Sequence, residues 1–331
     1  MKVQTVGVVG GGAWGTALAN AAAVAGRDVV LWMRDRLAAR AMSEERENRP
    51  YLPGVRLHDR VRPTADAADL GGVEAALLVT PAQTIRAVLR ELAPLLEGEA
   101  AIVSCAKGIE RGTGSFLSEI IAETRPGSPV AVLSGPSFAA DVARGLPTAL
   151  TLACPDLDRA AALAAALSGP TLRVYHGEDL RGVEIGGAGK NVLAIACGVI
   201  AGRGLGESAK AALIARGFAE LLRFARAYGG RAETLMGLSG LGDLVLTCAS
   251  AQSRNFAFGE RIGRGFSVNE AADGKLVEGA HTAGVLIALA RVKEVEMPVS
   301  DAVDAILGGQ MGVEDAIEAL MSRPLRAEGE R

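Results

Sequence analysis

Three glycines near the start of the chain have the spacing G-x-G-x-x-G: Gly10, Gly12 and Gly15. A β-branched run at residues 5–9, which predicts a buried strand, precedes them, and an alanine-rich run at residues 13–25, which predicts a helix, follows. In such a turn the first glycine allows the tight bend, the second lets the backbone approach a pyrophosphate, and the third lets helix and strand pack closely. A second predicted strand, residues 28–33, completes the order of a βαβ dinucleotide-binding unit.

The composition of the same segment suits two other functions. No charge separates Lys2 from Arg27, and the run between them could serve as a secretion signal or a membrane span. The glycine spacing favours the dinucleotide turn, because neither alternative requires it. We therefore expect the N-terminus to be retained and the protein to be cytoplasmic, since cleavage near Ala23 would remove the whole phosphate-binding turn.

Length, charge and cysteine content exclude several classes of protein. With 331 residues, 49% of them hydrophobic, the chain can fill the cores of two domains. Its net charge of -3, without a long basic or acidic block, gives no indication of a nucleic acid or an anionic membrane as partner. The cysteines lie far apart without a C-x-x-C pair, which predicts reduced, buried thiols and no zinc or other metal site: Cys105, Cys154, Cys197 and Cys248.

The chain changes character near residues 175–183. Before that point short apolar runs alternate with helical segments, which favours a mostly parallel sheet covered by helices. Further strands are predicted at residues 75–80, 100–105, 130–134, 148–153 and 172–175. After it, long periodic stretches at residues 207–228 and 282–292 predict helices. We therefore predict an α/β fold with a Rossmann-type doubly wound sheet over residues 1–182, an all-helical domain over residues 183–331, and a site in the cleft between them.

Two polar stretches directly follow predicted strands. Carboxyl ends of strands face the ligand in doubly wound folds, so Lys107 in the stretch SCAKGIE is expected to point into the crevice. A solvated loop lysine is the alternative. The stretch SGPSF contains Ser137, whose hydroxyl is expected to line the same crevice, although small residues and proline also favour a plain turn.

A cation and an amide, Lys190 and Asn191, begin the predicted small-residue helix of the stretch GGAGKNVLAIACG. Burying a lysine is costly unless a carboxylate or a substrate compensates. A desolvated lysine can donate and accept a proton near neutrality, as carbonyl reduction requires. Asp243, flanked by glycine and leucine, is the expected partner, and a purely structural Lys190 is the alternative.

Arg254 and Asn255 place a planar cation beside an amide. This pair suits a clamp for a phosphate or a carboxylate, because both side chains donate hydrogen bonds to anions. The alternative is a capped helix start followed by an exposed arginine.

The three stretches above and a fourth, from Leu238 to Asn255, which contains Asp243 and Arg254, resemble the bacterial NAD(P)-dependent sn-glycerol-3-phosphate dehydrogenase family. The stretch GGGAWGTAL at residues 10–18 and the loop NRPYLPG at residues 48–54 belong to the same resemblance. The match runs in order from the first strand to Glu278. It implies a Rossmann domain, a helical substrate domain and reversible reduction of dihydroxyacetone phosphate to sn-glycerol 3-phosphate, a glycerophospholipid precursor. It further implies a cytoplasmic homodimer whose partner is a small phosphorylated substrate, with no nucleic acid and no membrane span.

The resemblance also implies roles for individual residues. Lys190 would be the general acid in reduction and the general base in oxidation, Lys107 would hold the substrate near the nicotinamide, and Asp243 would orient Lys190. Further substrate contacts would come from Gly135, Ser137, Thr247, Ser253, Arg254 and Asn255. The cofactor would be contacted by Gly10, Gly12, Ala13, Trp14, Gly15, Arg34, Lys107, Ala139, Arg254, Leu276 and Glu278.

The end of the second predicted strand favours NADPH, at least equally with NADH. A strand-end acid would bind the ribose 2′-hydroxyl and repel a 2′-phosphate, whereas Arg34 stands here and Asp35 follows at once. Two positions depart from the family pattern. Gly189 replaces a bulky apolar residue, which is expected to loosen the helix start at Lys190, and His281 replaces an arginine, which puts a charge near the cofactor in doubt.

A proton relay through histidine is poorly supported, because none of the three histidines lies in a motif: His58, His176 and His281.

Two other functions remain open. A reductase of another small keto acid, such as a ketopantoate-type enzyme, would use a lysine but would not need both the Arg254 clamp and the SGPSF loop. A non-catalytic dinucleotide-sensing protein would need the glycine turn but no buried Lys190.

Overall fold

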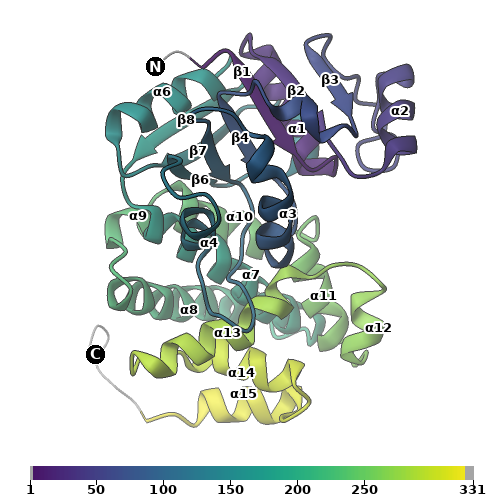
Figure 1. Cartoon of the computed structure of the whole chain (residues 1–331). Coiled ribbons are helices and arrows are strands. Elements are labelled where there is room, and N and C mark those ends of the chain that lie inside the picture. The colour runs from purple at the N-terminus through teal and green to yellow at the C-terminus, as the bar shows by residue number, and fades with distance from the viewer. Residues whose placement is uncertain (1–2, 325–331) are drawn as a thin grey trace. The chain divides into compact units, whose positions relative to one another are not determined.

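The structure, a computed structural model, describes residues 3–324 (Figure 1). Lys2, cited above for the N-terminal run, and residues 325–331, the end of the predicted helical domain, lie outside the described residues. The strands are β1 Thr5–Val9, β2 Asp28–Trp32, β3 Val61–Thr64, β4 Ala75–Leu78, β5 Ala101–Ser104, β6 Val130–Ser134, β7 Thr148–Ala153 and β8 Leu172–Gly177. The helices are α1 Ala13–Val24, α2 Arg36–Glu45, α3 Ile85–Leu92, α4 Leu117–Thr124, α5 Ala139–Ala143, α6 Leu157–Leu167, α7 Leu180–Gly202, α8 Glu207–Ala227, α9 Ala232–Met236, α10 Asp243–Cys248, α11 Arg254–Gly263, α12 Val268–Ala272, α13 Glu278–Val292, α14 Pro298–Leu307 and α15 Val313–Met321.

The eight strands form one sheet in the order β3-β2-β1-β4-β5-β6-β7-β8. Neighbouring strands are parallel except β6 and β7, so the predicted mostly parallel sheet is confirmed. The strand β3 was not predicted, because Arg62 and Pro63 interrupt its apolar pattern and proline is tolerated at a sheet edge. The strand order reverses between β1 and β4, and ligands of doubly wound folds bind at the carboxyl ends of such strands.

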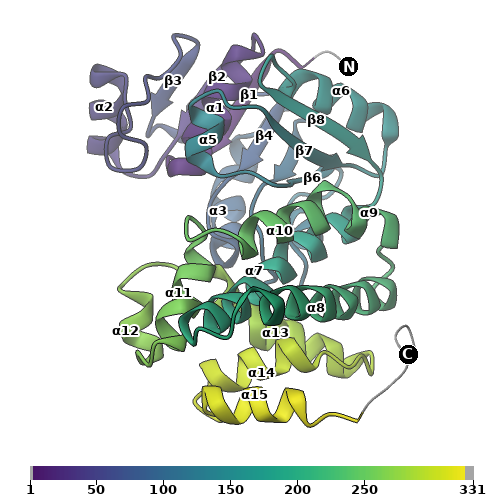
Figure 2. The same cartoon turned by 180° about the vertical axis from the view of Figure 1, so that it is seen from behind.

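Alternate side chains of the central strands pack against helices on the two faces of the sheet. On one face Val8 and Leu77 belong to the core that includes α1 and α6, the helices that cover the sheet in Figure 2. On the other face Val9 and Leu78 pack with α3 and α4, seen in Figure 1. The strands are therefore buried on both faces, as a parallel sheet requires.

The helix α7 begins at Leu180, so Lys190 lies near its middle, and the prediction that a helix begins at Lys190 is wrong. The glycines that suggested a break permit close packing instead. A Cβ atom on Gly189 would lie 2.3 Å from the Leu221 Cδ2 atom, so glycine lets the Leu221 side chain of α8 pack directly against the backbone of α7. Gly189 therefore does not loosen a helix start.

The helix α7 is also apolar enough and long enough, by composition and length, to cross a membrane, but 89% of its most apolar window is buried inside the protein. It is a core helix. The apolar run near the start of the chain divides into β1 and α1, which confirms the predicted strand, turn and helix. The four cysteines are buried, as predicted, and within residues 3–324 none of them forms a disulfide.

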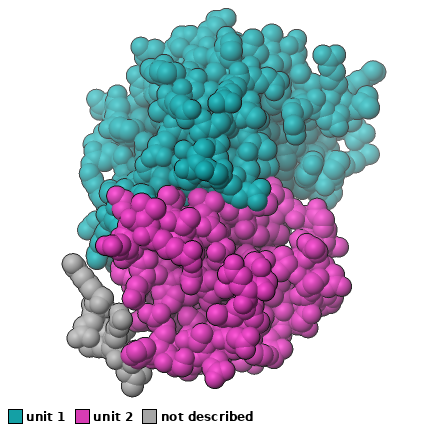
Figure 3. Space-filling view, turned by 60° about the horizontal axis from the view of Figure 1, so that its bottom comes forward, with its two compact units in different colours: residues 1–188, 225–246 teal, residues 189–224, 247–331 magenta. Residues whose placement is uncertain are grey.

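The chain forms two compact units, which Figure 3 colours separately. Unit 1 comprises Met1–Ala188 with Ala225–Leu246, and unit 2 comprises Gly189–Phe224 with Thr247–Arg331. The sequence placed a single boundary at residues 182/183. The units instead divide inside α7 at Ala188, and unit 1 takes up a second segment from the helical region.

Candidate active site

The glycine turn after β1 leaves space for a ligand. Gly10 has a φ of 126°, and a Cβ atom on Gly15 would lie 1.9 Å from the Gly10 carbonyl oxygen, so side chains are excluded at both positions. A Cβ atom on Gly12 would meet no protein atom within 4 Å. The first backbone N–H groups of α1 and the positive end of its dipole lie beside this space. The turn therefore fits the pyrophosphate of a dinucleotide.

Asn48, which the sequence did not single out, holds this turn in place. Its Nδ2 atom donates to the Gly11 carbonyl at 2.9 Å and to the Thr16 Oγ1 atom at 2.7 Å, and Thr16 in turn donates to the Gly12 carbonyl at 2.9 Å. The Asn48 side chain is buried. The only available signal was its position at the start of the loop NRPYLPG.

Arg34 and Asp35 follow β2 and differ in their contacts. The Asp35 Oδ1 atom caps α2, where it accepts from the Leu37 and Ala38 backbone N–H groups at 2.9 and 3.1 Å. The Arg34 side chain is exposed, and within residues 3–324 it makes no hydrogen bond or ion pair. The acid is thus engaged locally, while the cation remains available to an anionic ligand.

The other predicted cofactor residues are distributed over both units. Ala13 and Trp14 form the first turn of α1, where Trp14 packs against the core beneath it, and Ala139 is the first residue of α5. Leu276 and Glu278 belong to unit 2, and Glu278 is the first residue of α13.

Lys107 lies in the loop after β5, as predicted, and is held by two acceptors. Its Nζ atom donates to the Asp243 Oδ2 atom at 2.6 Å and to the Gly135 carbonyl at 3.2 Å. The Asp243 side chain is fully buried, and the Lys107 side chain is 18% exposed. Ser137 also donates to the Gly135 carbonyl, at 3.1 Å. Among the described residues these contacts use two of the three N–H donors of Lys107.

Lys190 lies on the buried part of α7 and donates from Nζ to the Thr247 Oγ1 atom at 2.8 Å. The sequence did not predict this contact, nor the ion pair that joins Asp243 to Lys107. The expected role of Asp243 in orienting Lys190 stays a prediction.

The first turn of α11 carries the predicted anion clamp. Ser253 caps the helix, where its Oγ atom accepts from the Phe256 backbone N–H at 3.2 Å. The Arg254 side chain that follows is exposed, and in the described part of the chain it has no hydrogen-bond or ion-pair partner. A free guanidinium beside a helix N-terminus is a favourable place for an anion.

Asn255 differs from Arg254, because its amide is already engaged at both ends. Its Nδ2 atom donates to the Asn191 Oδ1 atom at 2.9 Å, and its Oδ1 atom accepts from the Gly279 backbone N–H at 2.9 Å. The residue as a whole is only 8% exposed. Asn255 thus joins α7, α11 and the start of α13, and substrate binding through its remaining N–H stays a prediction.

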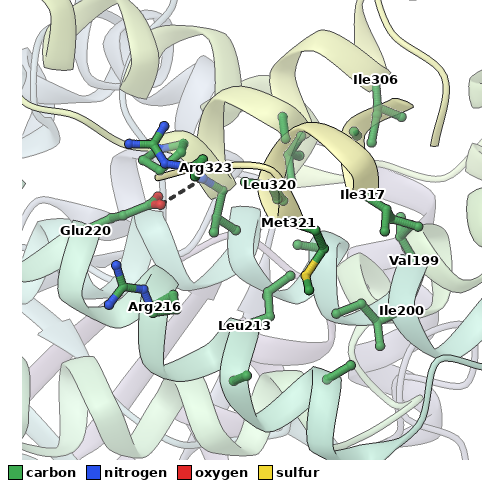
Figure 4. Close-up of a pocket in the computed structure, with 18 of the residues that line it drawn as sticks. Val199, Ile200, Leu213, Arg216, Glu220, Ile306, Ile317, Leu320, Met321 and Arg323 are labelled. Carbon is green, nitrogen blue, oxygen red and sulfur yellow. Dashed lines mark hydrogen bonds between the residues drawn. The ribbon is translucent and has the colours of Figure 1, made fainter. Parts of the chain in front are cut away.

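A groove of about 800 Å³ lies within unit 2, lined by side chains of α7, α8, α14 and α15 (Figure 4). Aliphatic side chains such as Ile200, Leu213 and Ile317 form much of its wall, and Arg216 and Glu220 also line it. None of the predicted site residues belongs to this wall. The groove is therefore separate from the residues described above.

A turn fitted to a dinucleotide, at the carboxyl end of a strand in a doubly wound sheet, is typical of nicotinamide-dependent oxidoreductases. That lysine, rather than histidine, handles the proton stays a prediction. Within residues 3–324 no group of three or more His, Cys, Asp or Glu side chains could hold a metal ion.

Comparison with known proteins identifies the family. Residues 5–160 match the N-terminal family of NAD-dependent glycerol-3-phosphate dehydrogenase, and residues 179–318 match its C-terminal family. The chain is 65% identical over 330 residues to glycerol-3-phosphate dehydrogenase (NAD(P)+) of Methylobacterium radiotolerans, with 99% of each chain covered. The corresponding enzyme of Azorhizobium caulinodans is 59% identical over 323 residues, with 98% of each covered. The chain belongs to the NAD-dependent glycerol-3-phosphate dehydrogenase family, and it is an oxidoreductase that uses NAD(P)+ on glycerol 3-phosphate.

Solved structures agree with this assignment. Glycerol-3-phosphate dehydrogenase of Coxiella burnetii superposes with a TM-score of 0.92 at 39% identity, covering 97% of this chain and 99% of that one. A ketopantoate reductase of Ralstonia eutropha reaches a TM-score of only 0.59 at 19% identity and shares the fold alone. The comparisons thus favour the glycerol-3-phosphate enzyme over the ketopantoate-type reductase and over a non-catalytic sensor.

Proposed function

We propose that Lys190 is the general acid of carbonyl reduction and the general base of alcohol oxidation. The observation that carries this proposal is the burial of Lys190, a residue only 7% exposed on an apolar helix, whose ammonium group is hydrogen-bonded to the Thr247 hydroxyl. Burying a lysine is costly, so chemistry is a sufficient reason to keep one there. The cofactor supplies the hydride to the carbonyl carbon when bound, and Lys190 delivers the proton to the carbonyl oxygen.

Lys107 is the cation that holds the substrate. Asp243 and the Gly135 carbonyl fix its ammonium group and leave one N–H donor, which suits a hydrogen bond to a substrate oxygen on which negative charge develops. In this role Asp243 acts through Lys107, because it fixes the direction in which that donor points.

Arg254 binds the substrate phosphate. Its exposed, unengaged guanidinium and the N-terminus of α11 together offer a fork of donors and a positive dipole end to a dianion. The engaged amide of Asn255 supports the same turn, since it fixes the start of α11 relative to α13.

The enzyme accepts NADPH at least as well as NADH. Arg34 is available to a 2′-phosphate, whereas the Asp35 carboxylate, which would repel it, caps α2. In the cell the enzyme reduces dihydroxyacetone phosphate and supplies sn-glycerol 3-phosphate for glycerophospholipid synthesis, as a cytoplasmic homodimer. These last points depend on the family resemblance.

The test is a substrate panel with purified protein. Oxidation of NADPH and of NADH is followed with dihydroxyacetone phosphate, unphosphorylated dihydroxyacetone and ketopantoate, and sedimentation gives the mass of the particle in solution. We expect turnover with dihydroxyacetone phosphate on both cofactors, little with the other two substrates, and a particle of twice the chain mass. Equal turnover with and without the substrate phosphate would contradict the proposed phosphate site.

A further inference from the structure

The loop between β5 and α4, residues 105–116, carries Lys107 and is closed on itself. Ile109 pairs with Phe116 in an isolated antiparallel bridge. Between them the Glu110 backbone N–H donates to the Ser115 carbonyl, and the Gly114 N–H donates to the Glu110 carbonyl, both at 3.0 Å. The backbone that follows Lys107 therefore has one defined path, and Glu110 lies at its base.

Gln83, in the turn before α3, binds this loop through both ends of its amide. Its Nε2 atom donates to the Ile109 carbonyl at 2.8 Å, and its Oε1 atom accepts from the Arg111 backbone N–H at 2.9 Å. The two contacts lie on either side of Glu110. Gln83 thus provides hydrogen-bond partners for two backbone groups of the loop that no neighbouring strand pairs with.

Arg86, on the first turn of α3, binds the side chain of Glu110 itself. Its Nε atom donates to both carboxylate oxygens, at 2.9 and 3.1 Å, and one terminal nitrogen donates to Oε2 at 2.9 Å. The Thr113 hydroxyl adds a further bond to Oε2 at 2.6 Å. The two side chains are only 17% and 12% exposed, so this fork-shaped pair is shielded from solvent and holds one geometry.

We propose that Gln83 and the Arg86–Glu110 pair are positioning residues that hold Lys107 in its working place for the dehydrogenase reaction. The Lys107 ammonium group meets Asp243 and the Gly135 carbonyl only if its flexible four-carbon side chain starts from a fixed backbone. The clamp on residues 109–111 supplies that fixed point. A displacement of about 1 Å at a substrate-holding group is enough to cost about a hundredfold in rate. This proposal rests on the proposed role of Lys107.

A clamp that served stability alone would behave differently. Loosening it would reduce the free energy of unfolding and leave the folded enzyme with unchanged kcat and KM. A clamp that acts through Lys107 changes catalysis, and its effect must disappear when Lys107 is already absent, because mutations with a shared partner are not additive.

The experiment is a set of double-mutant cycles on the full chain. Gln83→Met keeps the size of the side chain and removes both loop contacts, Glu110→Gln removes the charge of the pair, and each is combined with Lys107→Met. Glu123→Gln is the matched control, because it breaks the other ion pair of Arg86, 2.7 Å long, and leaves the loop untouched. kcat and KM for dihydroxyacetone phosphate and urea unfolding are measured for every variant.

We expect Gln83→Met and Glu110→Gln to lower kcat/KM about tenfold in the wild-type background and less than about twofold in the Lys107→Met background. Glu123→Gln should stay within about twofold of wild type. The clamp is overturned if both loop variants keep wild-type kcat/KM, or if they lose the same factor in both backgrounds. A Lys107→Met enzyme with near-normal activity would instead overturn the role of Lys107, and the clamp with it, so the two failures are distinguishable.

Discussion

The Lys107 ammonium group lies 2.6 Å from the carboxylate of Asp243, a residue with no solvent exposure that is 136 positions further along the chain. The ammonium group beside it compensates for the cost of burying this carboxylate. This ion pair connects the loop after β5 with the start of α10. It also leaves Lys107 as the partner that can turn toward a ligand, since Asp243 has no access to solvent.

Replacing Asp243 should therefore damage catalysis through Lys107. Asp243→Asn removes the charge but keeps one oxygen for the hydrogen bond, so we expect kcat/KM for dihydroxyacetone phosphate to fall about ten- to a hundredfold. Steady-state kinetics measure this loss. Asp28→Asn breaks the exposed pair with Arg60 and should stay within about twofold, so it is the control. A fully active Asp243→Asn enzyme would contradict the role given to this pair.

Lys190→Met should lose at least about a hundredfold in kcat, because proton transfer acts in the transition state. The dissociation constant for NADPH, measured by fluorescence titration without substrate, should change little, since the glycine turn holds the pyrophosphate elsewhere. Thr247→Val, which removes the hydroxyl contact of Lys190, should lose less, about tenfold. Near-normal turnover of Lys190→Met would make this lysine structural.

Arg34→Ala should weaken NADPH binding more than NADH binding, because only NADPH carries the 2′-phosphate that a guanidinium can bind. Titration with each cofactor gives the dissociation constants of the variant and of the wild type. We expect affinity to fall about tenfold for NADPH and less than about twofold for NADH. Arg40→Ala is the control, because Arg40 lies on the nearby helix α2 in an exposed pair with Glu44. It should alter the binding of neither cofactor. An equal loss for both cofactors would exclude Arg34 as the discriminating residue.

Stability should depend on pH through Glu220, which caps α14 through the Val299 and Ser300 backbone N–H groups. Burial raises the pKa of Glu220 from its ordinary 4.5 to about 7, against the opposing hydrogen bonds and the charge of Arg223. The folded protein then binds more protons than the unfolded chain between these values, so the free energy of unfolding falls as pH rises from about 4.5 to about 7.

The contribution is fully present below about pH 4.5 and is lost above about pH 7, and its upper bound is about 3 kcal/mol. Urea unfolding at about pH 5, 6 and 8 measures the slope. Glu220→Gln should flatten it in part, because Glu184, whose pKa is also raised to about 7 by burial, retains its own dependence. A slope that Glu220→Gln leaves unchanged would count against this assignment.

The elements that the sequence predicted correctly are those that local patterns determine. The turn between β1 and α1 needs glycines at fixed positions for steric reasons, so the spacing alone identified Gly10 and Gly15. The partners of Lys107 and Lys190 were missed, because a contact across 136 or 57 positions leaves no local pattern. The predicted start of helix α7 at Lys190 was wrong for a related reason. Glycine destabilises a helix through its own backbone, whereas the packing that offsets this cost involves distant segments.

Asn255 shows the same limit at a residue that was predicted to bind the substrate. Its side chain suggested an anion clamp with Arg254, yet its buried amide joins three helices, and no feature of its neighbours in sequence distinguishes these functions.

Arg254→Ala tests the phosphate site most directly. A hydrogen bond to a charged group contributes roughly 1.5–3 kcal/mol, so kcat/KM for dihydroxyacetone phosphate should fall about ten- to a hundredfold or more. Unphosphorylated dihydroxyacetone, which lacks the charge, should be affected much less. The comparison is made at saturating NADPH, because the family resemblance also places Arg254 near the cofactor. Arg264→Ala, which removes an exposed arginine paired with Glu260 just after the end of the same helix, is the matched control and should alter neither substrate. If Arg254→Ala lowers activity on both substrates by the same factor, Arg254 does not bind the phosphate.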